Sequence, residues 1–82
     1  MLTSEQLRAA RSLLGWSQDK LALTAGVSLS TVKRMEQSRG PVRGNATNVW
    51  KAQRALEEAG VVFIKPDDGG GPGARLRSPI EP

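Results

Sequence analysis

Apolar residues recur at helical spacing in three short segments of the first 37 residues, and each segment opens in the same way. A hydroxyl residue stands where a helix N-cap is needed, with one apolar residue before it and another four positions after it. The three caps are Thr3, Ser17 and Ser28. The predicted helices cover residues 4–14, 18–25 and 28–37, and Gly15 and Gly26 are placed to end the first two.

A loop rich in Gly, Pro and Arg follows over residues 38–45, and then the helical pattern returns. A fourth helix is expected to begin near Asn45 or Thr47 and to stop at Gly60. One face of this helix should join the core, because its residues keep helical spacing: Val49, Ala52, Gln53 and Leu56.

The pattern changes to strands after Gly60. Residues 61–65, VVFIK, are β-branched and aromatic and predict a strand whose two faces are both apolar. Residues 74–77, ARLR, predict a second short strand with Ala74 and Leu76 facing inward. A lone hairpin is marginally stable in water, so it must either pack on the first and fourth helices or pair with another subunit. We expect residues 66–73 to be a flexible connection, and the tail after Arg77 to be frayed.

The second and third helices meet the demands of a helix-turn-helix. Such a unit needs a small residue at the helix crossing, a residue tolerant of positive φ in the turn, and an apolar plug directly after it. Ala22, Gly26 and Val27 stand at these places. The remaining inward positions follow at helical spacing and are Leu21, Ala25, Val32 and Met35.

Composition narrows the class of protein. The 82 residues suffice for one small domain, and twelve Lys and Arg against eight Asp and Glu give a net charge of +4, which favours a polyanionic partner. Without any Cys or His, disulfides, thiolate or imidazole chemistry and the usual zinc sites are excluded, so we expect no enzyme, no metal and no cofactor. The first helix is interrupted by Arg8 and Arg11, which predicts no signal peptide and no membrane span, and therefore a cytoplasmic protein.

Arg11 lies inside the apolar stripe of the first helix, between Leu7 and Leu14. A charge on a core-facing strip needs a partner, because an unpaired buried charge is costly. Helical spacing does not say which residue that partner is.

The sequence from Arg11 to Glu36 also resembles that of a known family. The pattern R-x-x-L-G-W-S-Q-x-x-L-A-x-x-A-G-V-S-x-x-T-V-x-R-x-E resembles the Cro/repressor-type (XRE-like) helix-turn-helix transcriptional regulators, over roughly residues 2–60. The resemblance implies that Glu36 is the partner of Arg11. It also implies a mainly α fold, a compact four-helix repressor-like DNA-binding domain, here with a C-terminal two-stranded β-hairpin.

The resemblance further assigns DNA contacts. In this family the outer face of the third helix reads base edges in the major groove. The implied base-reading residues are Leu29, Ser30, Lys33 and Arg34. The implied phosphate contacts are Ser17, Gln18, Ser28, Thr31, Arg39 and Arg43.

A single recognition helix covers too few base pairs to find one site in a genome, so we expect a homodimer on palindromic double-stranded DNA. The candidate dimer contact is the strand formed by Val61, Val62, Phe63 and Ile64, because it has surplus apolar surface. The domain would then comprise residues 1–65, and residues 66–82 would hold the Gly-rich connection, second strand and tail.

Other interpretations of the sequence stay open. The scaffold could instead be a protein-interaction module, as in an antitoxin or anti-activator, or more remotely an RNA-binding domain. Trp16 and Trp50 fit core or corner packing better than base stacking. Leu23 faces away from the inner stripe and could contact solvent, a second subunit or the fourth helix, while Asp67 and Asp68 fit a solvated turn better than a metal loop.

Overall fold

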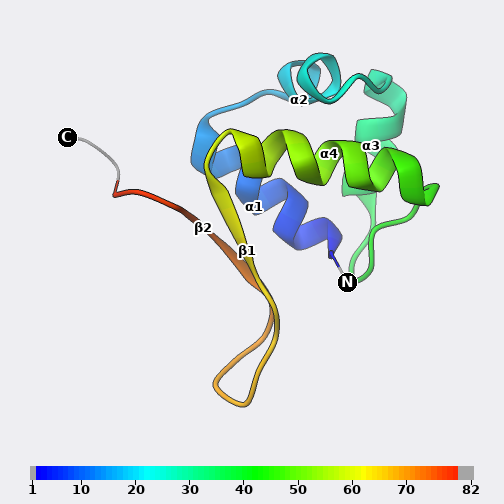
Figure 1. The fold of residues 1–82 in the computed structure, drawn as a ribbon. Coiled ribbons are helices and arrows are strands. Elements are labelled where there is room, and N and C mark those ends of the chain that lie inside the picture. Colours follow the sequence, from blue (N-terminus) through cyan, green and yellow to red (C-terminus); the bar gives the residue numbers. More distant parts are fainter. Residues whose placement is uncertain (1, 80–82) are drawn as a thin grey trace.

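Four helices and a C-terminal hairpin make up the fold (Figure 1). The computed structural model describes residues 2–79, so the last three residues of the tail that we expected to be frayed lie outside the described part. The elements are α1 (Ser4–Leu14), α2 (Gln18–Ala25), α3 (Leu29–Gln37), α4 (Ala46–Glu58), β1 (Val61–Ile64) and β2 (Gly73–Leu76). The mainly α fold with a C-terminal hairpin is confirmed.

The helices begin where the capping residues predict, and α1 and α2 end at the predicted glycines, whereas α4 ends at Glu58 with Ala59 as its C-cap, one residue before the expected Gly60. Thr3 and Gln6 form a capping box at the start of α1, and the hydroxyl groups of Ser17 and Ser28 accept backbone N–H groups at the starts of α2 and α3. Asn45, the earlier of the two expected positions, caps α4. Local sequence therefore fixes the helix boundaries before any packing is considered.

The core lies between the helices and the inner face of the hairpin. α1 packs on α3, α4 and both strands, while α2 packs on α3 and α4. The buried apolar side chains come from every helix and from β1: Leu2, Leu7, Ala10, Leu21, Ala22, Val32, Met35, Ala52, Ala55, Leu56 and Val61. In a domain of this size the core is small, so the polar contacts that surround it matter for the stability of the fold.

The hairpin closes within the chain. β1 and β2 are antiparallel, with Val61 opposite Leu76 and Phe63 opposite Ala74 on the face that packs against the core. The inward orientation predicted for Ala74 and Leu76 is therefore confirmed, as is packing on α1 and α4. β1 begins at Val61 as predicted but ends one residue early, at Ile64, and β2 is shifted by one residue to Gly73–Leu76.

Gln6 attaches the hairpin to α1, a role that the sequence did not reveal. Its side-chain oxygen completes the capping box, and its Nε2 donates to the backbone carbonyls of Ile64 at 3.1 Å and Gly73 at 2.9 Å. The side chain is 5% exposed. One side-chain amide thus accepts a backbone N–H at the start of α1 and donates to a backbone carbonyl in each strand of the hairpin.

The connection between the strands, which we expected to be flexible, contains a hydrogen-bonded turn. Asp67 and Gly70 exchange two backbone hydrogen bonds, of 2.9 and 3.2 Å. The Asp67 carboxylate accepts the Gly69 N–H at 2.8 Å. Asp67 and Asp68 are both exposed, in agreement with a solvated turn.

Candidate nucleic-acid interface

The turn between α2 and α3 sets the angle at which α3 is presented. Gly26 adopts φ 74°, and the N–H groups of Gly26 and Val27 both donate to the Ala22 carbonyl, at 3.0 and 3.1 Å. Val27 is half-buried against the core, where it was expected to plug the corner. With Val32 and Met35 fully buried, the opposite face of α3 is left outward.

Arg11 and Glu36 form an ion pair that fixes α3 to α1. Nε and Nη2 of Arg11 donate to the two carboxylate oxygens of Glu36, at 2.8 and 3.0 Å, and Nη1 donates to the Trp16 carbonyl at 2.8 Å. The Glu36 side chain is 3% exposed and that of Arg11 is 23% exposed. The periodicity argument demanded a partner for Arg11, and the structure supplies the one that the family resemblance implied.

Two further side chains of α1 hold the C-terminal half of α3, and neither was singled out from the sequence. The buried Ser4 hydroxyl donates to the Met35 carbonyl at 2.7 Å. Arg8 donates through Nη1 to the carbonyls of Glu36 and Ser38, the latter at 3.1 Å. Cations stabilise the C-terminal end of a helix, so Arg8 caps α3 from a neighbouring helix. An arginine one turn before Arg11 was the only sequence signal.

The outward face of α3 carries the predicted polar and basic residues, with one exception. Ser30, Lys33 and Arg34 are exposed. Leu29 was expected on this exposed face, but it is half-buried and packs against the core, which leaves it less surface for a base contact. Gln37, one turn after Lys33, is exposed on the same helix and was not predicted.

Residues predicted to contact phosphate at the two helix starts already have partners within the chain. The Ser28 hydroxyl contacts the hydroxyls of Ser30 at 3.1 Å and Thr31 at 2.8 Å. The Gln18 side chain donates to Glu36 at 3.1 Å, so it supports the buried ion pair. Because its side chain is engaged, Gln18 can offer an anion only its backbone N–H, as the first residue of α2.

The loop after α3 is tied to the start of α1. Ser4 N–H donates to the Gly40 carbonyl at 2.8 Å, Val42 N–H to the Leu2 carbonyl at 3.0 Å, and Gly40 N–H to the Glu5 carboxylate at 2.9 Å. This last bond, with the nearby positive charges of Arg8 and Arg39, holds the pKa of Glu5 below its ordinary value. The loop is thus held by bonds at both sides of Arg39.

Arg43 of this loop lies beside Arg34 of α3. Together with Gln37 and Ser38 they line a shallow depression of about 360 Å³. The Ser38 hydroxyl is buried there and, among residues 2–79, has no hydrogen-bond partner. Two guanidinium groups side by side suit an anion such as a phosphate. Arg39 does not line this depression and lies instead near Glu5.

A family model described as helix-turn-helix matches residues 7–57, which include most of α1, all of α2 and α3, and nearly all of α4. The chain belongs to the helix-turn-helix family of the Cro/repressor (XRE-like) type. A search of curated proteins found no relative of the chain. The matched region ends before the hairpin, so family membership accounts for the helices and leaves β1 and β2 to be explained from this structure.

As a helix-turn-helix protein of this family, the chain is DNA-binding. No helix among residues 2–79 has the length and apolar character needed to cross a bilayer. Within the same residues, no three His, Cys, Asp or Glu side chains gather where they could hold a metal ion.

The four residues predicted as a dimer contact are not equivalent in this helix-turn-helix protein. Val61 is 3% exposed and Phe63 packs against the core, so both side chains are engaged within their own chain. Val62 is half-buried and Ile64 is 39% exposed, and both lie on the outer face of the hairpin. Burial leaves the Val61 side chain almost no free surface for a second subunit, so a dimer contact through side chains would use mainly Val62 and Ile64.

Two of the exposed large apolar side chains come from α2 and α4. Trp50 was expected to pack in the core or at a corner, but it is 60% exposed, with the Arg54 guanidinium 5.8 Å from its ring centre. Leu23 is 82% exposed, so it is free of α4. Trp16, in contrast, packs against the core as predicted.

Proposed function

We propose that this protein is a sequence-specific transcriptional regulator of the repressor type, which reads the major groove with α3 as a homodimer on a palindrome. The observation that carries the proposal is the division of α3 into two faces. Val32, Met35 and Glu36 are locked into the domain, while Ser30, Lys33 and Arg34 are free to meet an external surface. A rigid helix with a polar and basic outer face is what base reading requires.

The DNA contact proposed for each residue follows from its side-chain chemistry. Arg34 has a planar fork that can contact O6 and N7 of one guanine, and such a pair contributes about 1–3 kcal/mol of discrimination. Ser30 and Lys33 would contact neighbouring bases, and Leu29 would offer its remaining surface to a thymine methyl group. Arg43 and the backbone at the starts of α2 and α3 would bind phosphates, as would Arg39 farther along the loop.

Dimerisation completes the proposal, because one recognition helix reads only a few base pairs. Two copies related by a two-fold axis would place their α3 helices in successive major grooves, about 34 Å apart. Such a dimer with about six to ten phosphate contacts should lose affinity by a factor of roughly 10³–10⁵ between 50 and 200 mM salt.

DNA selection from a random pool, followed by titration of the selected site, tests this function. We expect a palindrome to be enriched, Arg34→Ala to relax the preference at one base position, and Arg43→Ala to weaken all sequences about equally. Arg75→Ala is the matched control, since it removes an exposed arginine from the hairpin, outside the α3 region. Salt-dependent binding without any sequence preference would refute the proposal.

A protein-interaction module is the second candidate, and the exposed Leu23 and Trp50 favour it. Large apolar side chains on the surface of a small domain often mark contacts with another protein. If Leu23→Ser and Trp50→Ser leave selection of DNA unchanged but abolish capture of a defined protein partner, both roles reside in one chain. If the wild-type chain selects no DNA, the interaction module becomes the better description.

A further inference from the structure

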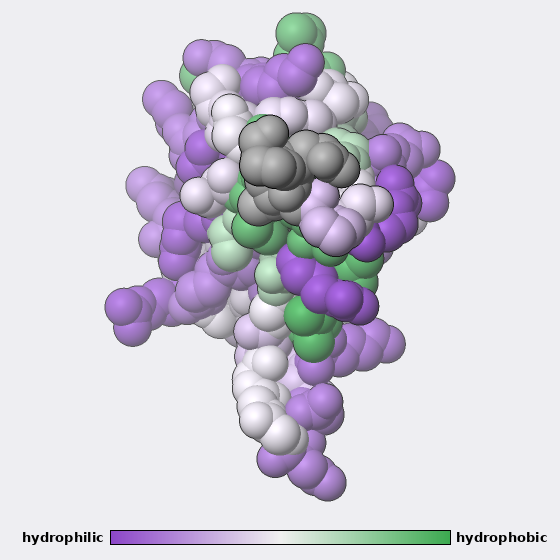
Figure 2. All heavy atoms as spheres, turned by 90° about the vertical axis from the view of Figure 1, so that its left-hand side faces the viewer, coloured by the Kyte–Doolittle hydropathy of each residue, from purple (hydrophilic) through white to green (hydrophobic). Residues whose placement is uncertain are grey.

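The hairpin and the helical body meet at a depression of about 240 Å³ between α4, β1 and the start of α1, which we call the hairpin pocket. Figure 2 shows that hydrophobic side chains gather where the hairpin meets the helices, whereas the tip of the hairpin is neutral to hydrophilic. No lining residue belongs to α2, α3 or the loop after α3, so the hairpin pocket is separate from the proposed DNA interface.

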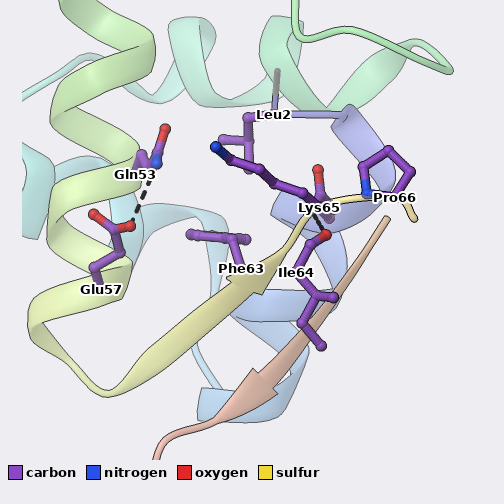
Figure 3. Close-up of a pocket in the computed structure, with 8 residues that line it drawn as sticks. Leu2, Gln53, Glu57, Phe63, Ile64, Lys65 and Pro66 are labelled. Atoms are coloured by element: carbon purple, nitrogen blue, oxygen red, sulfur yellow. Dashed lines mark hydrogen bonds between the residues drawn. The ribbon is translucent and has the colours of Figure 1, made fainter. Parts of the chain in front are cut away.

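The more buried part of the lining is apolar. Leu2 is 9% exposed, and the half-buried Phe63 points toward α4 (Figure 3). Gln6 also lines the hairpin pocket, but its Nε2 already donates to the carbonyls of Ile64 and Gly73. Because a glutamine amide has two hydrogens, both are used. This part of the hairpin pocket therefore offers contact surface to an aliphatic group and no free donor.

The outer part of the lining carries one charge of each sign. Glu57 belongs to the end of α4 and Lys65 directly follows β1, and Figure 3 shows the Lys65 side chain extending toward Gln53 and Glu57. Within residues 2–79, the Glu57 carboxylate accepts one hydrogen bond, from Gln53 at 3.3 Å, and neither Glu57 nor Lys65 forms an ion pair. Both charges are therefore available to a ligand.

We propose that the hairpin pocket binds a free α-amino acid with a small aliphatic side chain. The ammonium group of the ligand donates to Glu57, and its carboxylate accepts from Lys65 and from the second Nε2 hydrogen of Gln53. Its side chain packs between Leu2 and Phe63. This binding site goes beyond the proposed DNA-binding function and does not depend on it.

The volume of the hairpin pocket sets the size of the ligand. Liquid water occupies about 30 Å³ per molecule, so the space holds about eight groups of that size. Sites for drug-sized ligands span about 300–1,000 Å³ and are larger. Leucine, with about nine non-hydrogen atoms, matches the available space. A ligand with both charges should bind more tightly than one with a single charge, because charge-assisted hydrogen bonds then form at both Glu57 and Lys65.

Calorimetric titration of the unmodified chain with L-leucine, in the absence of DNA, tests the site. We expect saturable binding with a Kd of roughly 0.1–1 mM, because a ligand of so few atoms makes few contacts. Two probes are matched to leucine: 4-methylpentanoate lacks only the ammonium group, and 3-methylbutylamine lacks only the carboxylate. Each should bind at least about tenfold more weakly than leucine, because one charge-assisted contact is lost.

Substitutions assign each charge to one end of the ligand. Glu57→Gln and Lys65→Gln should each weaken leucine binding at least about tenfold. Lys65→Gln should bind 3-methylbutylamine as well as the unmodified chain does, because that probe has no carboxylate to lose a partner. The matched controls are Glu58→Gln and Lys51→Gln, which remove the same charges from exposed positions of α4 outside the hairpin pocket and should leave leucine binding unchanged.

Amide hydrogen exchange of the unmodified chain needs no substitution. The ligand contacts both α4 and β1, so the hairpin cannot separate from the helices while leucine is bound. Exchange of the Arg77 amide, which donates to the Gly60 carbonyl at 2.7 Å, should therefore slow about tenfold at a leucine concentration about nine times Kd. The Lys20 amide, bonded to the exposed Ser17 hydroxyl at the start of α2, opens by local fraying and should not change.

Three results would overturn the proposal. They are equal affinity for leucine and the two singly charged probes, leucine binding that survives both Glu57→Gln and Lys65→Gln, and no saturable binding up to about 20 mM leucine, far above the expected Kd. Selection of DNA by α3 is measured separately, so each of these results leaves the proposed regulator function intact.

Discussion

Removal of the Arg11 guanidinium should be among the most destabilising single changes in this protein. Arg11→Ala leaves the Glu36 carboxylate, 3% exposed, with only the Gln18 amide as a side-chain partner, and it also removes the donor to the Trp16 carbonyl. Breaking a buried pair by deleting one member costs about 3–5 kcal/mol. Domains of this size have a total stability of about 4–12 kcal/mol, taking about 0.05–0.15 kcal/mol per residue.

The two members of the pair should not cost the same. Glu36→Ala leaves Arg11, whose side chain is already 23% exposed and can turn toward water. Arg11→Ala leaves a carboxylate that has no such route, so we expect it to be the more costly of the two. The double variant should cost at least about 1.5 kcal/mol less than the sum of the single ones, because charge-assisted hydrogen bonds of about 1.5–3 kcal/mol each are lost only once.

Urea unfolding followed by circular dichroism measures these differences. With a slope near 1 kcal/mol per molar urea, typical of a small domain, Arg11→Ala should lower the midpoint by about 3 M or leave the chain unfolded without urea. Arg54→Ala is the control, because Arg54 and Glu58 form an exposed pair with side chains 51% and 68% exposed. Surface pairs contribute about 0–1 kcal/mol.

The reasoning fails if Arg11→Ala costs no more than Arg54→Ala, or if the double-variant cycle gives a coupling below about 0.5 kcal/mol, the usual limit of additivity. Either result would mean that packing of Val32 and Met35 alone fixes α3 to the rest of the domain.

Three further changes test other contacts. Gln6→Leu should cost about 1–3 kcal/mol and release the hairpin before the helices unfold, seen as faster amide exchange in β1 and β2, because two strand carbonyls lose their donor. Gly26→Ala should cost about 1–2 kcal/mol from backbone strain alone, since φ is 74° and a Cβ would meet nothing within 4 Å, whereas Gly71→Ala should change the unfolding free energy little. Glu5→Gln should destabilise the protein near neutral pH, and this difference should shrink as the pH falls below about 4.5 and be lost as it passes the lower pKa of the folded state, because only the ionised carboxylate stabilises the fold. Urea midpoints at pH 7 and pH 3 decide the last case, and a difference as large at pH 3 as at pH 7 would contradict it.

The sequence by itself determined the local elements of this protein. Caps at Thr3, Ser17 and Ser28, with glycines at 15 and 26, act through backbone groups within a few residues, so the helix boundaries could be derived without knowledge of packing. The inner face of the helix-turn-helix followed for the same reason, since helical periodicity places Leu21, Ala22, Val32 and Met35 on one side.

The tertiary structure decided which side chains meet across long stretches of chain. Gln6 bonding to residues 64 and 73, Arg8 capping α3 and Gln18 turning toward Glu36 all depend on how helices cross, and periodicity within one helix carries no such information. The same holds for exposure, since only packing of neighbouring elements half-buries Leu29 and leaves Trp50 on the surface. For the hairpin, β propensity predicted the strands, but only their position over α1 and α4 assigned Val61 to the core and left Ile64 on the surface.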